Sequence, residues 1–211
     1  MNRNKKGFTL IELLVVIAIV AVLAVVVILT LNPAELLRQA RDSNRVSDAA
    51  TMKSAMALYL ADVATPYIGT NMLGDTANQT VVCFNSASTT ASNTAGCGGV
   101  FSVTAFATAS SGRPASTTLI RNINGTGWVP VDFTAISSKS PISNLPVDPT
   151  NLSGNYYAYA ASGTASIAPT YKFVVKAMES SKYQFNGGSD AVSTDGGTAT
   201  SSLEVGTNLN L

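Results

Sequence analysis

A lone carboxylate, Glu12, stands inside the most apolar part of this sequence, and its position is the first sign of chemistry. The residues from 8 to 11 before it and from 13 to 31 after it carry no charge. A carboxylate within a membrane helix costs about 2.5–3.5 kcal/mol on insertion scales, so its presence indicates a function, such as pairing with a cation. The alternative is that Glu12 lies near one end of the segment and simply reaches the polar interface.

The rest of the chain offers little for catalysis. It contains no histidine, which excludes His-based triads, His metal ligands and imidazole acid–base chemistry. Its 13 basic and 12 acidic residues give a formal net charge of +1, without the basic excess typical of nucleic-acid binding. We therefore expect a protein that is not an enzyme and has no nucleic-acid partner.

The element that would position Glu12 is a long apolar helix. From Leu13 to Leu29 every residue is Leu, Val, Ile or Ala, and Thr30 and Leu31 extend this stretch. As a helix it measures about 28 Å, which matches a bilayer hydrocarbon core of about 30 Å. The basic residues that precede it favour a cytoplasmic N-terminus: Arg3, Lys5 and Lys6. The general prediction is a signal peptide or a signal anchor.

The residues around this boundary resemble a known processing signal. The run from Lys5 to Leu14, KKGFTLIELL, is similar to the class III signal of type IV prepilins and of type II secretion pseudopilins. The resemblance implies that a membrane peptidase cleaves between Gly7 and Phe8 and methylates the new N-terminus. It also implies an assembly role for Phe8 and Glu12. The ammonium of one subunit would meet the Glu12 carboxylate of a neighbour, at low dielectric in the filament core.

A second, amphipathic helix is predicted after the apolar stretch. Asn32 and Pro33 suit a helix restart. Apolar residues at steps of three and four then indicate one packed face: Ala49, Met52, Met56, Leu60 and Val63. The charged residues are spaced for pairs three apart: Glu35 with Arg38, and Arg45 with Asp42 or Asp48. Two interpretations of these charges stay open, a solvated face and contacts between subunits near the membrane surface.

Beyond Pro66 the composition changes to Gly, Ser, Thr, Asn and Ala, and short strands are predicted at 81–84, 101–106, 117–123, 156–161, 171–178 and 203–205. A long helix followed by antiparallel strands indicates an α+β fold. The segment from Pro141 to Pro149 is similar to the Leu-Pro-x-Asp-Pro element of pseudopilin-type heads. The resemblance therefore implies the type IV pilin fold, in which a long N-terminal helix packs on a small antiparallel sheet.

Two further site predictions concern the head. Cys83 and Cys97 enclose a loop of about 15 residues, and export would favour a disulfide that stabilises the fold by about 3 kcal/mol. The Gly-rich loop with Asp190 and Asp195 resembles the C-terminal calcium loop of major pseudopilins, and carboxylates suit Ca²⁺. The alternative is a solvated Gly/Ser/Thr turn region. No cofactor other than calcium is expected.

The domain organisation expected is a leader (1–7), a transmembrane and filament-core helix (8–31), an amphipathic helix (32–65) and an extracytoplasmic β-rich head (66–211). We expect a structural subunit of a type IV pilus or type II secretion pseudopilus. It would be a single-pass precursor in the inner (cytoplasmic) membrane, then part of a cell-surface or periplasmic filament. Its expected partners are the membrane, prepilin peptidase, other pilin subunits (copies of itself and minor pilins) and the pilus assembly platform. The alternative is a single-pass membrane-anchored surface protein whose head binds a carbohydrate or another ligand.

Overall fold

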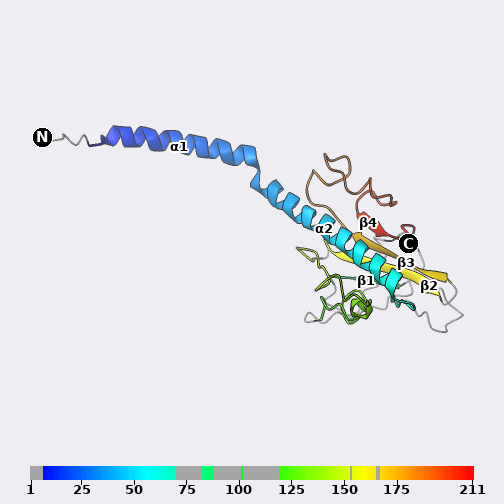
Figure 1. Ribbon diagram of the computed structural model, residues 1–211. Coiled ribbons are helices and arrows are strands. Elements are labelled where there is room, and N and C mark those ends of the chain that lie inside the picture. Colours follow the sequence, from blue (N-terminus) through cyan, green and yellow to red (C-terminus); the bar gives the residue numbers. More distant parts are fainter. Residues whose placement is uncertain (1–6, 70–81, 88–100, 102–118, 153, 165–166) are drawn as a thin grey trace. The chain divides into compact units, whose positions relative to one another are not determined.

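Within the described residues, the fold has two α-helices, a short 3-10 helix (Phe133–Ala135) and a four-stranded sheet (Figure 1). The computed structural model describes residues 7–69, 82–87, 101, 119–152, 154–164 and 167–211. The chain divides into two units, Met1–Arg38 and Gln39–Leu211.

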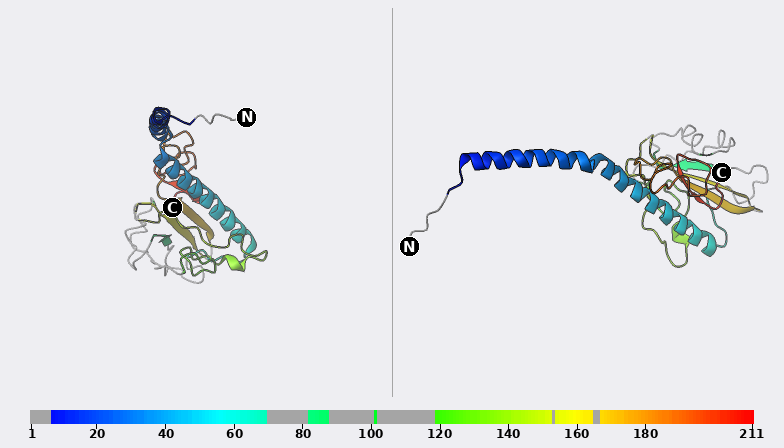
Figure 2. Two further views of the ribbon diagram at one scale, coloured as in Figure 1. Left: turned by 90° about the vertical axis from the view of Figure 1, so that its left-hand side faces the viewer. Right: turned by 90° about the horizontal axis from the view of Figure 1, so that it is seen from above.

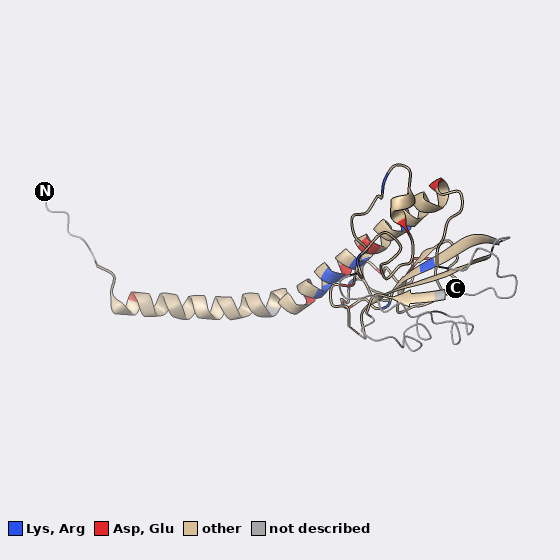
Figure 3. Ribbon diagram, turned by 90° about the horizontal axis from the view of Figure 1, so that it is seen from below, with Lys and Arg blue, Asp and Glu red and all other residues tan. Residues whose placement is uncertain are grey.

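Helix α1 (Leu10–Leu31) is apolar on every side. Glu12 is its one charged residue, and Figure 3 shows the helix uncharged along almost its whole length. The large apolar side chains described along it are 49–81% exposed, so no described residue covers them. At about 33 Å, α1 is long and apolar enough to cross a bilayer.

The boundary between the two helices lies at Asn32. Its φ of 41° falls in the left-handed region, which Asn tolerates better than most residues. The Asn32 carbonyl accepts hydrogen bonds from the backbone N–H groups of Glu35 at 3.0 Å and Leu36 at 3.3 Å. Helix α2 (Pro33–Asp62) therefore begins at Pro33, as the sequence predicts, because the fixed φ of proline suits the first helical position.

The sheet is antiparallel throughout, in the order β1 (Val82–Asn85), β2 (Tyr157–Thr164), β3 (Ile167–Val175) and β4 (Leu203–Gly206). The register places Tyr157 opposite Val175 and Tyr159 opposite Phe173. Because side chains alternate along a strand, these four residues lie on one face.

The main core forms between this face and α2, which lies along it in Figures 1 and 2. Ala49, Met52 and Met56 of the predicted stripe are at most 1% exposed, and Leu60 and Val63 are partly buried beside them. Aromatic side chains fill the sheet side, with Tyr157 and Phe173 at 5.3 Å and Trp128 and Phe173 at 5.9 Å between ring centroids. The predicted α+β fold is confirmed.

The opposite face of the sheet buries an ion pair. Lys172 and Glu204 are each 1% exposed, and Lys172 Nζ lies 2.6 Å from Glu204 Oε1. The same ammonium donates to the carbonyls of Leu209 at 2.9 Å and Leu211 at 3.0 Å. These contacts hold the chain after β4 against the sheet.

Some predicted strands differ from the structure. The predicted strand at 117–123 is wrong for its described part, because residues 119–121 form a turn in which the Asn122 N–H donates to the Leu119 carbonyl. Turn-forming Asn and Gly residues, at 122, 124 and 125, outweigh the β propensity of the preceding residues. Most of the predicted strand at 101–106, all but Phe101, lies outside the described residues.

Candidate functional site

The fold places no demand on the glycine at position 7. A Cβ added to Gly7 would meet nothing within 4 Å, and Gly7 is not among the described residues with positive φ. The next residue, Phe8, is 87% exposed. Packing against the described residues therefore does not explain a glycine followed by an exposed aromatic side chain.

Glu12 makes a contact with Thr9 that was not predicted from the sequence. Its Oε2 accepts hydrogen bonds from the backbone N–H and the hydroxyl of Thr9, both at 2.8 Å, while the Glu12 N–H donates to the Thr9 hydroxyl at 3.3 Å. Thr9 and Glu12 thus form a capping box at the start of α1. The Thr-x-x-Glu spacing in the sequence is the signal that could have predicted it. Among the described residues Oε1 has no partner, so this oxygen remains available.

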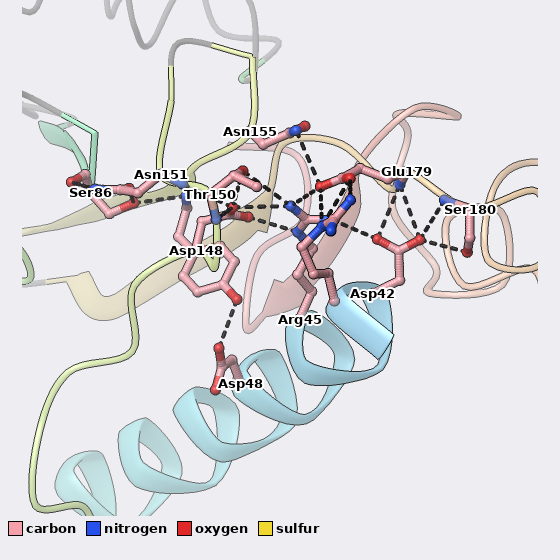
Figure 4. A network of polar contacts seen from close by, with 12 residues as sticks. Asp42, Arg45, Asp48, Ser86, Asp148, Thr150, Asn151, Asn155, Glu179 and Ser180 are labelled. Atoms are coloured by element: carbon pink, nitrogen blue, oxygen red, sulfur yellow. Dashed lines mark hydrogen bonds and ion pairs between the residues drawn. The ribbon is translucent and has the colours of Figure 1, made fainter. Parts of the chain in front are cut away.

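A polar cluster is buried in the head, where α2 meets two loops (Figure 4). Arg45 lies at its centre and is 0% exposed. Its guanidinium donates to both oxygens of Asp148, at 2.7 and 3.0 Å, to Asp42 Oδ1 at 2.7 Å and to Glu179 Oε1 at 2.6 Å. Asp148 precedes β2 and Glu179 follows β3, so a single side chain joins three separate segments.

Asp42 completes the junction. Its Oδ2 accepts hydrogen bonds from the Ser180 hydroxyl at 2.6 Å and the Ser180 N–H at 2.7 Å, and both of its oxygens accept the Glu179 N–H at 3.0 Å. Arg41 forms an ion pair with Glu179. Two guanidinium groups therefore face three carboxylates. These groups suit a structural network, because they include no nucleophile.

The environment of the cluster favours the charged form of Asp148 and Glu179. Burial alone would raise the pKa of Asp148, but hydrogen bonds from Arg45 and Thr150 outweigh it and hold the pKa below its usual range. The hydrogen bond from Arg41 lowers the pKa of Glu179.

The expectation of a solvated face is wrong for Asp42 and Arg45, which are buried within their own chain and are not available to other subunits. The predicted Asp42–Arg45 pair exists, but Asp48 instead accepts a hydrogen bond from the Tyr157 hydroxyl at 2.7 Å. For Arg38, whose side chain is 52% exposed and lies 3.7 Å from Glu35, a solvated role and a contact between subunits both stay open. Charged residues on α2 are most frequent in its first half, as Figure 3 shows.

The structure describes only one cysteine of the predicted pair. Cys83 lies in β1 and is 3% exposed, whereas Cys97 lies outside the described residues. The disulfide between them stays a prediction.

The two carboxylates of the predicted calcium loop serve as turn caps. Asp190 accepts hydrogen bonds from the Ser193 hydroxyl at 2.6 Å and from three backbone N–H groups, which lower its pKa to about 2. Asp195 accepts from the N–H groups of Gly197 at 2.7 Å and Glu204 at 2.6 Å. Within the described part of the chain, no group of three or more Cys, Asp or Glu side chains could hold a metal ion. Calcium binding stays a prediction.

Comparison with protein families gives a match at the N-terminus, where residues 2–28 fit the model of the prokaryotic N-terminal methylation motif. The chain carries an N-terminal methylation motif. This motif is the class III signal of type IV pilins and pseudopilins, so the resemblance found in the sequence is confirmed over these residues. No curated protein and no solved structure gives a significant match.

The methylation motif covers Gly7, Phe8 and Glu12 and most of α1. It points to a structural protein rather than an enzyme. Together with an apolar helix capable of crossing a bilayer, it is consistent with a pilin-like, membrane-anchored precursor.

Proposed function

We propose that this protein is the precursor of a filament subunit of a type IV pilus or a type II secretion pseudopilus. A membrane peptidase would remove residues 1–7 and leave Phe8 as the methylated N-terminus. Residues 8–31 would anchor the subunit in the membrane until assembly and then pack in the filament core. The head would lie outside the cytoplasmic membrane.

The main support for this proposal is the methylation motif, together with an apolar helix whose large side chains are exposed. Cleavage ahead of α1 would keep the helix and leave an ammonium group at Phe8, four positions before Glu12. The exposed apolar side chains of α1 have no partner in the described chain, so lipid or other copies of α1 would cover them. Gly7 is unexplained by packing, which supports its recognition by an enzyme.

The charge of Glu12 has an evident use in such a filament. An apolar helix core has a low dielectric, where an unpaired carboxylate is costly. An ammonium group at Phe8 of a neighbouring subunit would offset that cost and would fix the axial stagger between the two helices.

Processing is tested by the mass of the mature protein. Expressed in a host that has prepilin peptidase, the wild-type chain should begin at Phe8 with a methylated amine. The variant Gly7→Val should remain at full precursor mass, because a branched side chain would block the peptidase without disturbing the fold. Intact mass spectrometry of both proteins makes this measurement.

Gly188→Val is the matched control, since Gly188 also has nothing within 4 Å of its ideal Cβ but lies in the head. This variant should be processed like the wild type. A mature wild-type protein that still contains residues 1–7 would contradict the proposal and would favour a simple single-pass surface protein.

A further inference from the structure

The connection between β3 and β4, orange to red in Figure 1, contains a cavity of about 310 Å³. The buried side chains of Met178 and Val192 line it together with Phe185, which is 52% exposed. Phe185 thus brings an aromatic side chain to the lining, and the volume is at the lower end of the 300–1,000 Å³ typical of ligand pockets.

Polar groups whose hydrogen-bonding capacity is not filled by described residues share the lining. Gln184 donates its Nε2 to the Met178 carbonyl at 2.9 Å, which orients the amide and leaves Oε1 as an acceptor. The hydroxyls of Thr200 and Ser201 make no hydrogen bond to any other described residue. The lining contains no charged side chain.

These properties define the chemistry of an occupant. An anion would find no cation in the lining, and a wholly apolar ligand would leave the amide oxygen and both hydroxyls unpaired, at a free-energy cost. A neutral pyranose ring satisfies both parts. One of its faces presents C–H groups that pack on the negative face of an aromatic ring, and its hydroxyls both donate and accept.

We infer that this cavity binds one ring of a neutral saccharide, with Phe185 as the stacking platform and Gln184, Thr200 and Ser201 as hydrogen-bonding groups. Such a site would give the head an affinity for neutral glycans. Every residue of the site lies in the head, between β3 and β4, and none belongs to α1.

Ligand-observed NMR on the full chain tests this inference. The protein should be held in a detergent without a sugar headgroup, and the probes should be methyl glycosides of glucose and galactose at millimolar concentration. At least one of them should show saturation transfer from the protein. The uronic acid of the same ring should bind more weakly by about tenfold, because its carboxylate meets no cation.

Variants locate the site. Phe185→Ala should lower the affinity for the neutral glycoside by about tenfold, and Phe185→Trp should retain it, because stacking needs only an aromatic ring. Leu152→Ala removes another exposed apolar side chain, 67% exposed and outside the cavity, and should bind like the wild type. The inference is overturned if neither glycoside binds, if Phe185→Ala binds as well as the wild type, or if the uronic acid binds equally well.

Discussion

At the scale of single residues, Glu12 combines two roles that the structure allows to be separated. One carboxylate oxygen accepts both hydrogen bonds from Thr9 and so caps α1. The negative charge would serve the proposed pairing with an ammonium group of another subunit. Gln can also occupy the third position of a capping box, so the cap needs the oxygen but not the charge.

Glu12→Gln should therefore keep the cap and lose assembly. We expect normal processing and normal helix content by circular dichroism, with few or no filaments in electron micrographs. Thr9→Ala is the converse variant, because it removes the cap at a cost of about 1 kcal/mol but keeps the charge, and it should assemble. Abundant filaments from Glu12→Gln would refute the pairing.

The cysteine pair gives a second prediction at this scale. If Cys83 and Cys97 are bridged, the non-reduced protein should resist alkylation, and reduction should lower the free energy of unfolding by about 3 kcal/mol. Intact mass after iodoacetamide treatment, with and without a reducing agent, is the measurement. Alkylation of both thiols in the unreduced, denatured chain would show that no bridge forms.

At the scale of elements, the attachment of α2 to the head depends on both apolar packing and the Arg45 cluster. The apolar stripe of α2 fixes which side of the helix faces the sheet. Arg45 then connects that helix to the loop before β2 and the segment after β3. Because burying these charges is itself costly, we expect the cluster to contribute more to the position of the two segments than to net stability.

Loss of Arg45 should be strongly destabilising. Arg45→Met leaves the carboxylates of Asp42 and Asp148 buried without a cation, so the free energy of unfolding at about pH 7 should fall by about 3–5 kcal/mol. The emission of Trp128, the one tryptophan in the chain and 1% exposed, would follow denaturant unfolding. Arg38→Met is the matched control on the same helix and should change stability by less than about 0.5 kcal/mol.

The cluster also predicts a pH dependence. Asp148 and Glu179 have lowered pKa values in the folded state, against about 3.9 and 4.3 for unperturbed groups. Their stabilisation is therefore complete above about pH 5 and is lost as the pH falls through the folded pKa values. The wild type should lose stability below about pH 4, and the difference between wild type and Arg45→Met should shrink there. An equal difference at low and neutral pH would contradict this account.

At the scale of the whole molecule, the chain consists of an apolar unit and a unit with its own core. The described buried core residues all lie within the second unit, which begins at Gln39. Helix α1 contributes none of them. We therefore expect the first unit to contact lipid or other subunits and the second to fold in water.

Removal of residues 1–31 should separate these properties. We expect the shortened protein to be monomeric and soluble without detergent, and to unfold at the same denaturant concentration as the full chain when Trp128 emission is followed. Size-exclusion chromatography and the unfolding curve are the measurements. Aggregation, or a markedly lower unfolding midpoint, would show that the core needs α1.

Much of this protein was predictable from local patterns. The apolar length of α1, the restart at Pro33 and the stripe from Ala49 to Val63 follow from hydrophobic periodicity and proline geometry, which act over a few residues. The class III signal is a contiguous motif, so it too is recognisable from neighbouring residues alone.

Only the tertiary structure decided what the charges of α2 do. Asp42 and Arg45 look like a surface pair at helical spacing, and nothing nearby in sequence shows that Arg45 meets Asp148, 103 residues away. Such a contact depends on how the strands bring the loops to the helix, which is a property of the packed chain. The cavity at Phe185 also depends on packing, because its lining combines residues of the connection between β3 and β4 that lie up to 24 positions apart. The sequence thus determined the anchor, the signal and the helix faces, whereas long-range packing determined the buried cluster and the cavity.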